Sequence, residues 1–205
     1  MSDLSIIYAS AHKIPEYFAA NVLRQLYRAA GDIPVHEIHT TPEKSSITNY
    51  YRELIATAKT LKTPYIAFAE DDTLYPDEHF NHRPKTFAYN FNRWNIFTWS
   101  QPPFFSLCRR MILGTLIAPR EEFIEIMSER IKLPESQMVE PGRRDGEPSE
   151  VFETYNPIVV FSHPDSYGYG TKRKKAGKIR ALEIPRWGTA EDVMDAYENT
   201  PKPNN

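Results

Sequence analysis

Three acidic residues in a row, Glu70, Asp71 and Asp72, end the short apolar run YIAFAEDD (65–72). Successive residues of a strand face opposite sides, so we expect Glu70 and Asp72 to share a face while Asp71 points away. Two carboxylates on one face suit a hard divalent cation, which takes oxygen ligands and leaves coordination positions open for phosphate oxygens. The alternative is an exposed acidic turn that leads into the next element. The cation reading explains better why mutually repelling charges stand together.

A histidine occupies a similar position later in the chain. His163 directly follows the apolar residues VVFS (159–162) and precedes a strongly basic segment. A neutral imidazole is a common metal ligand, and the alternative is a hydrogen-bonded histidine at a strand end. His79 and His82 are three residues apart, but no third ligand stands near them, so we expect them to be structural.

Two groups of basic residues could neutralise a bound diphosphate. Lys172 and Arg173 begin a basic patch (172–180), and Arg143 and Arg144 stand in a second polar segment. The patch stands beside Tyr167 and Tyr169, and basic residues next to aromatic ones also suit nucleic acid. Charge runs of this kind are otherwise solvated surface.

The first half of the chain predicts the elements that would position these residues. Strands are expected at 4–10, 33–40 and 64–70, and helices at 14–30 and 45–61. This alternating order predicts a parallel sheet with helices on its faces. In open α/β sheets ligands bind beyond the carboxyl ends of the strands, where the three acids stand.

The second half reads differently. Residues 133–150 are polar and rich in proline and glycine, which predicts a loop, and a helix is expected to start near Pro148. The remaining predicted elements are strands at 95–100, 111–119 and 156–163 and a helix at 120–131.

The order of these motifs resembles that of GT-A glycosyltransferases, especially the family 2 type, over roughly residues 4–175. PYIAFAEDDTLYPDEHF is similar to the acidic metal-binding segment of the family, and LSIIYAS to its opening strand and nucleotide-binding loop. YYREL, ILGTLIAPREEF and VVFSHPDSYGYGTKRKK resemble the later arginine, glycine and histidine–basic segments. The chain departs from the family in two places. Glu70 stands where Asp is usual, and HEIHTTPEKSS replaces the usual DDGS, so that Glu37, His39, Thr40 or Thr41 would meet the base.

The resemblance implies an α/β fold of GT-A type, with a Rossmann-like nucleotide-binding half and a mixed central sheet. It implies transfer of a sugar from a nucleotide-diphosphate sugar to an acceptor hydroxyl, with Mn²⁺ or Mg²⁺ held by Asp72 and His163. The general base of an inverting reaction would be Glu147, or else Glu150, at the expected helix start. The implied donor-binding residues are Tyr8, Ala9, Ser10, Glu37, Arg52, Glu70, Asp71, Lys172 and Arg173.

Length and composition indicate the domain organisation and the localisation to expect. The chain has 205 residues, of which 40% are hydrophobic, and this suits one domain with a sizeable core. The formal net charge of −2 does not indicate a class of partner. We expect a catalytic domain over 1–180, divided into a nucleotide-binding half (1–76) and an acceptor and closing half (77–180). The extension 181–205 is expected to be disordered at its end. The chain shows no apolar run of ~20 residues, no signal-peptide pattern and one cysteine, so a cytoplasmic protein is expected.

The acceptor remains open at this stage. Saccharide or protein hydroxyls are the ordinary acceptors, and the basic patch adds a modified base in DNA as a further hypothesis. A rival hypothesis is a non-catalytic sugar- or nucleic-acid-binding module on a degenerate transferase fold. Another is a Mg²⁺-dependent phosphotransfer protein of the receiver type, which also needs acids after the first strand, where YASAHK stands.

Overall fold

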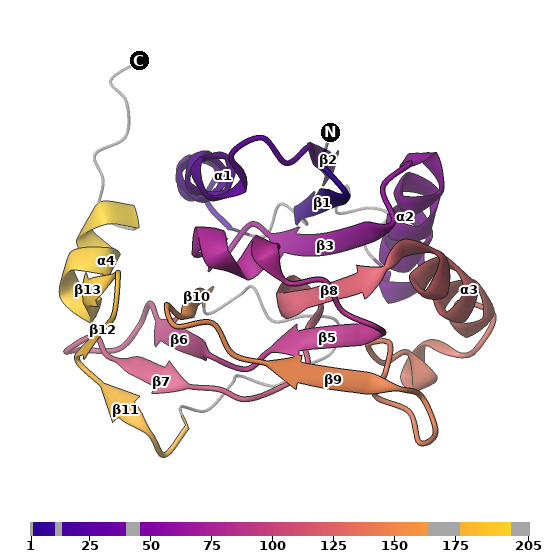
Figure 1. The fold of residues 1–205 in the computed structure, drawn as a ribbon. Coiled ribbons are helices and arrows are strands. Elements are labelled where there is room, and N and C mark those ends of the chain that lie inside the picture. Colours follow the sequence, from indigo (N-terminus) through magenta and orange to yellow (C-terminus); the bar gives the residue numbers. More distant parts are fainter. Residues whose placement is uncertain (1, 11–13, 40–45, 164–176, 198–205) are drawn as a thin grey trace.

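A parallel three-stranded unit forms the N-terminal part of the molecule (Figure 1). The computed structural model describes residues 2–10, 14–39, 46–163 and 177–197. Strand β1 lies in the middle and pairs in parallel with β3 on one side and β2 on the other. Tyr8 of β1 is therefore aligned with both Glu37 and Ala69. The elements of this unit are β1 (Leu4–Ser10), α1 (Glu16–Ala30), β2 (Val35–His39), α2 (Ile47–Thr60) and β3 (Tyr65–Glu70).

Local sequence explains both helices of this unit. Helix α1 buries Phe18, Val22 and Leu26, which recur at helical spacing on one face. Helix α2 begins after Ser46, whose side-chain oxygen accepts a hydrogen bond of 3.1 Å from the backbone N–H of Asn49. These boundaries agree closely with the predicted ones.

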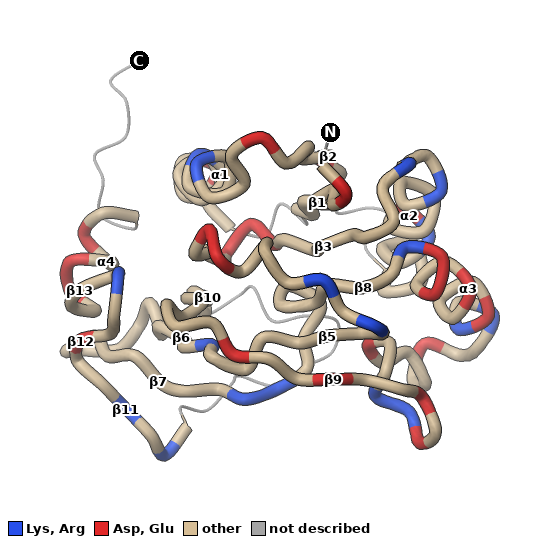
Figure 2. The backbone as a smooth tube through the Cα atoms, viewed as in Figure 1, with Lys and Arg blue, Asp and Glu red and all other residues tan. Residues whose placement is uncertain are grey.

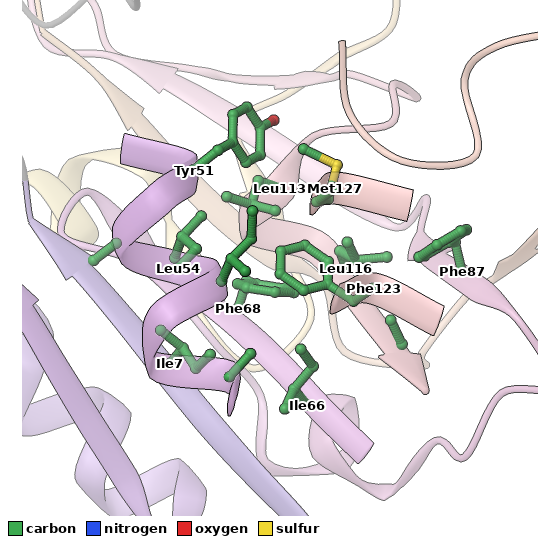
Figure 3. Close-up of a cluster of buried hydrophobic side chains, with 14 of the residues drawn as sticks. Ile7, Tyr51, Leu54, Ile66, Phe68, Phe87, Leu113, Leu116, Phe123 and Met127 are labelled. Carbon is green, nitrogen blue, oxygen red and sulfur yellow. The ribbon is translucent and has the colours of Figure 1, made fainter. Parts of the chain in front are cut away.

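The first sheet has six strands in the order β2-β1-β3-β8-β5-β9 and is mixed, because β8 runs antiparallel to both β3 and β5. The expected α/β fold with a mixed central sheet is thereby confirmed. Helices α2 and α3 pack on one face of this sheet, with Leu54, Phe68 and Phe123 between them (Figure 3). The further elements are β5 (Phe87–Asn90), β8 (Leu116–Pro119), α3 (Arg120–Arg130) and β9 (Ser149–Phe152).

A second sheet of five strands, in the order β11-β7-β6-β10-β4, starts directly after the acidic residues. The short strand β4 pairs antiparallel with β10, with Thr73 aligned with Val160. Its strands are β4 (Thr73–Leu74), β6 (Arg93–Phe97), β7 (Phe105–Leu107), β10 (Ile158–Ser162) and β11 (Arg180–Ala181). Short 3-10 helices are η2 (Asp77–Asn81), η3 (Leu113–Thr115) and η4 (Glu135–Gln137).

The described C-terminal segment contributes residues to the core. The hairpin β12 (Glu183–Ile184) and β13 (Gly188–Thr189) leads into α4 (Ala190–Tyr197). Ile184 and Val193 are buried in one hydrophobic cluster with Phe18 of α1 and Phe161 of β10. Segments on both sides of residue 180 therefore contribute to this cluster.

Several local predictions differ from the structure. The helix expected near Pro148 is absent, and residues 149–152 form strand β9 instead, because they pair in parallel with β5. The strand predicted at 111–119 is divided into η3 and β8. Among the described residues, none of the helices combines the length and the apolar character of a membrane span.

Candidate functional site

The acidic residues form a tight turn between the two sheets. Strand β3 ends at Glu70 and β4 begins at Thr73, so Asp71 and Asp72 are the turn residues. The hydroxyl of Ser10 donates a hydrogen bond of 2.6 Å to Oδ2 of Asp71. Since Ser10 ends β1, this bond ties the turn to the carboxyl end of the neighbouring strand. Acidic positions recur along the segment from β3 to η2 (Figure 2).

Asp72 is connected to the second sheet. Its backbone carbonyl accepts a hydrogen bond of 2.8 Å from the N–H of Phe161, and its Oδ1 accepts one of 2.9 Å from the hydroxyl of Thr73. His163 directly follows the same strand, β10, and is 8% exposed with its ring against that of Phe18. Burial lowers the pKa of His163, and the carboxylate of Asp72 opposes this shift. Asp72 and His163, far apart in the sequence, therefore lie within electrostatic range of each other.

Tyr8 lies beside this pair. Its side chain is buried on β1, and burial raises its pKa well above the ordinary value. The carboxylates of Asp71, Glu37 and Asp72 raise the pKa of Tyr8 further, so all three approach it. Glu37 also accepts a hydrogen bond of 2.6 Å from the hydroxyl of Tyr27 on α1. The α1 side of the first sheet thus gathers several residues that the sequence had nominated.

Glu70 faces the other side of the sheet. Its carboxylate lies against Gly114 of η3, and it raises the pKa of the buried Tyr51 on α2, after burial and the charge of Glu140. We expected Asp71 to point away from Glu70 and Asp72 together. Asp71 does lie on the side opposite to Glu70, but it approaches Tyr8 in company with Asp72. Glu70 and Asp72 therefore do not share a face as expected. Side chains alternate between the two faces only as far as Glu70, because β3 ends there and the chain turns.

The acids nominated as a general base lie elsewhere. Both oxygens of Glu147 are engaged, one by the guanidinium of Arg130 and the other by the N–H of Gly142 at 2.8 Å. Glu150 lies in β9, where its Oε1 accepts a hydrogen bond of 3.0 Å from the N–H of Lys85. In the order of the sheet β9 is three positions from β3, which at the usual strand spacing is about 14 Å. These contacts favour structural roles for both glutamates.

The remaining nominated residues are dispersed. Arg52 is exposed on α2 and donates a hydrogen bond of 2.9 Å to Oδ1 of Asn49. Arg143 pairs with Glu140, and its charge lowers the pKa of Tyr51, which places it within range of the Glu70 side of the turn. Lys172, Arg173, Thr40 and Thr41 lie outside the described residues.

The two nearby histidines are packed as structural residues. The rings of His79 and His82 both stack on Phe152 of β9, at centroid distances of 5.7 and 4.0 Å. Burial lowers the pKa of His79 to about 3, so its imidazole is neutral at pH 7. Among residues 2–10, 14–39, 46–163 and 177–197, no group of three or more His, Cys, Asp or Glu side chains is arranged to hold a metal ion.

Comparison with known proteins yields a distant structural likeness. No family model and no curated protein sequence matches the chain. A similar solved structure is the crystal structure of a glycosyltransferase involved in the glycosylation of the major capsid of PBCV-1. It shares 12% identity with a TM-score of 0.45, over 76% of this chain and 93% of that one. At this distance the functional conclusion depends on the site itself.

Two residues around the acidic turn have no role that their local sequence predicts. Tyr75 stands in the motif EDDTLYP, and Gly114 in the motif ILGT. The hydroxyl of Tyr75 accepts a hydrogen bond from the N–H of Glu70 at 3.1 Å and donates one to the carbonyl of Gly114 at 2.8 Å. The only signal in the sequence was the closeness of Tyr75 to the acids, which does not indicate where its hydroxyl would go.

Proposed function

We propose that this protein is a metal-dependent glycosyltransferase that moves a sugar from a nucleotide-diphosphate sugar to an acceptor hydroxyl. The observation that carries the proposal is the pairing of β4 with β10. This pairing brings Asp72 and His163 into range of each other at the carboxyl ends of β1 and β3, where ligands bind in open α/β sheets.

The chemistry of these side chains fits a divalent cation. One carboxylate and one imidazole make an incomplete site, and Mg²⁺ or Mn²⁺ is commonly held by one or two protein side chains, with substrate phosphates and water completing the shell. Burial keeps the imidazole of His163 in the neutral form that a ligand requires. When bound, the metal would supply Lewis-acid stabilisation of the charge that develops on the leaving diphosphate.

The protein itself would orient the donor. The end of β1, at Ala9 and Ser10, approaches the acidic turn through the bond between Ser10 and Asp71, so a nucleoside placed there would meet Asp71. We assign Glu70 to the donor on the other side of the turn. The charges of Arg130 and Arg143 both lower the pKa of the nearby Tyr51. Arg130 is buried and Arg143 is 44% exposed, so Arg143 is our candidate for the diphosphate.

An inverting transfer, which we propose, needs a general base near the acceptor hydroxyl. Glu147 and Glu150 remain the candidates in the sequence, although the contacts of both are structural. Replacing each by glutamine separates the roles, because a base lost in this way lowers kcat without a matching loss of stability. A loss of activity that follows thermal stability would instead assign the residue to the fold.

Donor turnover tests the proposal directly. The protein should be incubated with Mn²⁺ and a panel of nucleotide sugars, and release of the nucleoside diphosphate measured. We expect Asp72→Asn and His163→Gln to abolish release. Asp77→Asn is a matched control, because Asp77 follows closely in the chain but is 67% exposed and paired with Arg186. If no donor is hydrolysed or bound by the wild-type protein, the transferase proposal fails and a non-catalytic binding module becomes the better reading.

We propose DNA as the class of acceptor to test first. Lys178 and Arg180 are exposed at β11, and Arg180 lies over the ring of Phe104 at 4.7 Å, which combines cationic and aromatic surface. Binding to DNA that weakens steeply with added salt would support this acceptor. Absence of binding at low salt would direct attention to saccharide and protein acceptors.

A further inference from the structure

Gly114 has no side chain, and the carboxylate of Glu70 occupies the space beside it. A Cβ atom built on Gly114 would lie 2.5 Å from Oε2, 3.0 Å from Cδ and 3.2 Å from Cγ of Glu70, and these are the nearest heavy atoms around it. The backbone of Gly114 is not in the left-handed region, so its conformation does not call for glycine. A side chain at this position would compete with the carboxylate of Glu70 for the same space.

Tyr75 binds the backbone of the same two residues, Glu70 and Gly114. Its side chain is fully buried, and its hydroxyl joins the N–H of Glu70 to the carbonyl of Gly114. The side chain of Gln25 on α1 binds both backbone groups of Tyr75, accepting from its N–H at 3.0 Å and donating to its carbonyl at 2.6 Å. The tyrosine thus links α1, the end of β3 and η3.

We infer that Gly114 and Tyr75 are positioning residues that together seat the carboxylate of Glu70. The tyrosine fixes the backbone of Glu70 at the point where β3 ends, and the glycine admits its carboxylate beside η3. This inference rests on the proposed function for its consequence, since Glu70 is there assigned to the donor. The geometry of the seat itself does not depend on that assignment.

The inference predicts that binding and stability will respond differently to a methyl group at position 114. In Gly114→Ala the atom that must move first is the far end of a flexible side chain, so the fold can accommodate the change by displacing the carboxylate. We expect the thermal midpoint to remain close to that of the wild type. We expect the affinity for a nucleoside diphosphate with Mn²⁺ to fall about tenfold or more, as for other changes that misplace a ligand-binding group.

A double-mutant cycle between positions 70 and 114 is the first test. The dissociation constants of adenosine, guanosine, uridine and cytidine diphosphates with Mn²⁺ should be measured for wild type, Gly114→Ala, Glu70→Ala and the double variant. If Gly114 acts through Glu70, the glycine change weakens binding in the wild type and has no further effect once Glu70 is alanine. An equal loss in both backgrounds, or no loss in either, would overturn the inference.

A second measurement reports on the environment of the Glu70 carboxylate without any ligand. Carboxyl ¹³C resonances of labelled glutamates can be recorded, with the Glu70 signal assigned by its absence in Glu70→Ala. Gly114→Ala and Tyr75→Phe should shift this signal. Tyr89→Phe should not, although Tyr89 is also fully buried and its hydroxyl binds a carbonyl, that of Pro141 at 2.5 Å.

The two experiments separate the two ideas. If the Glu70 signal shifts but the wild type binds no nucleoside diphosphate, the proposed function fails and the positioning role stands. If the signal is unchanged in Gly114→Ala and Tyr75→Phe, the positioning role is refuted, whatever the protein binds.

Discussion

Replacing Glu147 by alanine should destabilise the protein more than any surface ion-pair change. Arg130 is 1% exposed, and its guanidinium binds Glu147 together with the carbonyls of Val139 and Glu140. The second oxygen of Glu147 accepts the N–H of Gly142, so the pair fastens the loop to α3. Removing the carboxylate leaves a buried cation without its counter-charge, which costs about 3–5 kcal/mol of unfolding free energy.

The assay is urea unfolding combined with a thermal scan. For a chain of this length each kcal/mol shifts the midpoint by roughly 2–4 °C, so Glu147→Ala should lower it by about 6–20 °C. Met at both positions 130 and 147 should cost less than the sum of the two single changes, because neither charge is then left alone. Glu129→Ala is the control. Its pair with Lys132 is 71% and 65% exposed, so the loss should stay within about 1 kcal/mol.

One result would refute the reasoning. If Glu147→Ala unfolds within about 1 kcal/mol of the wild type but loses donor turnover, then the pair with Arg130 is not what holds the loop. Glu147 would then return as the leading candidate for the general base.

Three further predictions concern pH, a helix end and the acidic turn. His79 has a folded pKa of about 3 against an ordinary value of 6.5, so the unfolded chain binds a proton that the native state does not. The contribution of His79 to the free energy of unfolding is therefore lost as pH falls below about 6.5, at about 1.4 kcal/mol per pH unit. In urea titrations from pH 7 to 5, the free energy of unfolding of His79→Phe should lack this part of the pH dependence. Ser46→Ala removes the cap of α2 and should cost about 1 kcal/mol in urea unfolding, while Ser46→Asp should retain most of it. Ser10→Ala removes the hydroxyl that binds Asp71 and should raise KM for the donor with little change in melting temperature; an unchanged KM would show that this hydrogen bond does not contribute to donor binding.

Local patterns were sufficient for the first half of the fold. The apolar spacing of Phe18, Val22 and Leu26 and the capping side chain of Ser46 place α1 and α2 almost at their observed bounds. The strands of the parallel unit are short apolar runs between turn residues, so they were also predictable. Strand β9 was not, because Ser149–Phe152 follows directly on a polar segment rich in proline and glycine and forms a strand by pairing with the distant β5.

The candidate site divides in the same way. The acids Glu70, Asp71 and Asp72 and the histidine His163 could be nominated from the sequence, because each stands at the end of an apolar run. Glu147 was nominated as a base for its place before a proline, and the burial of its partner Arg130 could not be read from its neighbours in the chain. Interactions between residues distant in the sequence leave no local pattern.

The sequence by itself determined which residues carry charge, where the chain turns and that the acids follow a buried strand. Only the tertiary structure decided which residues lie next to these acids. The pairing of β4 with β10 brings His163 to Asp72, the end of β1 brings Ser10 to Asp71, and η3 brings Gly114 to Glu70. The physical reason is that these partners are set by strand pairing and by close packing between distant segments, and both depend on the whole chain rather than on any stretch of it.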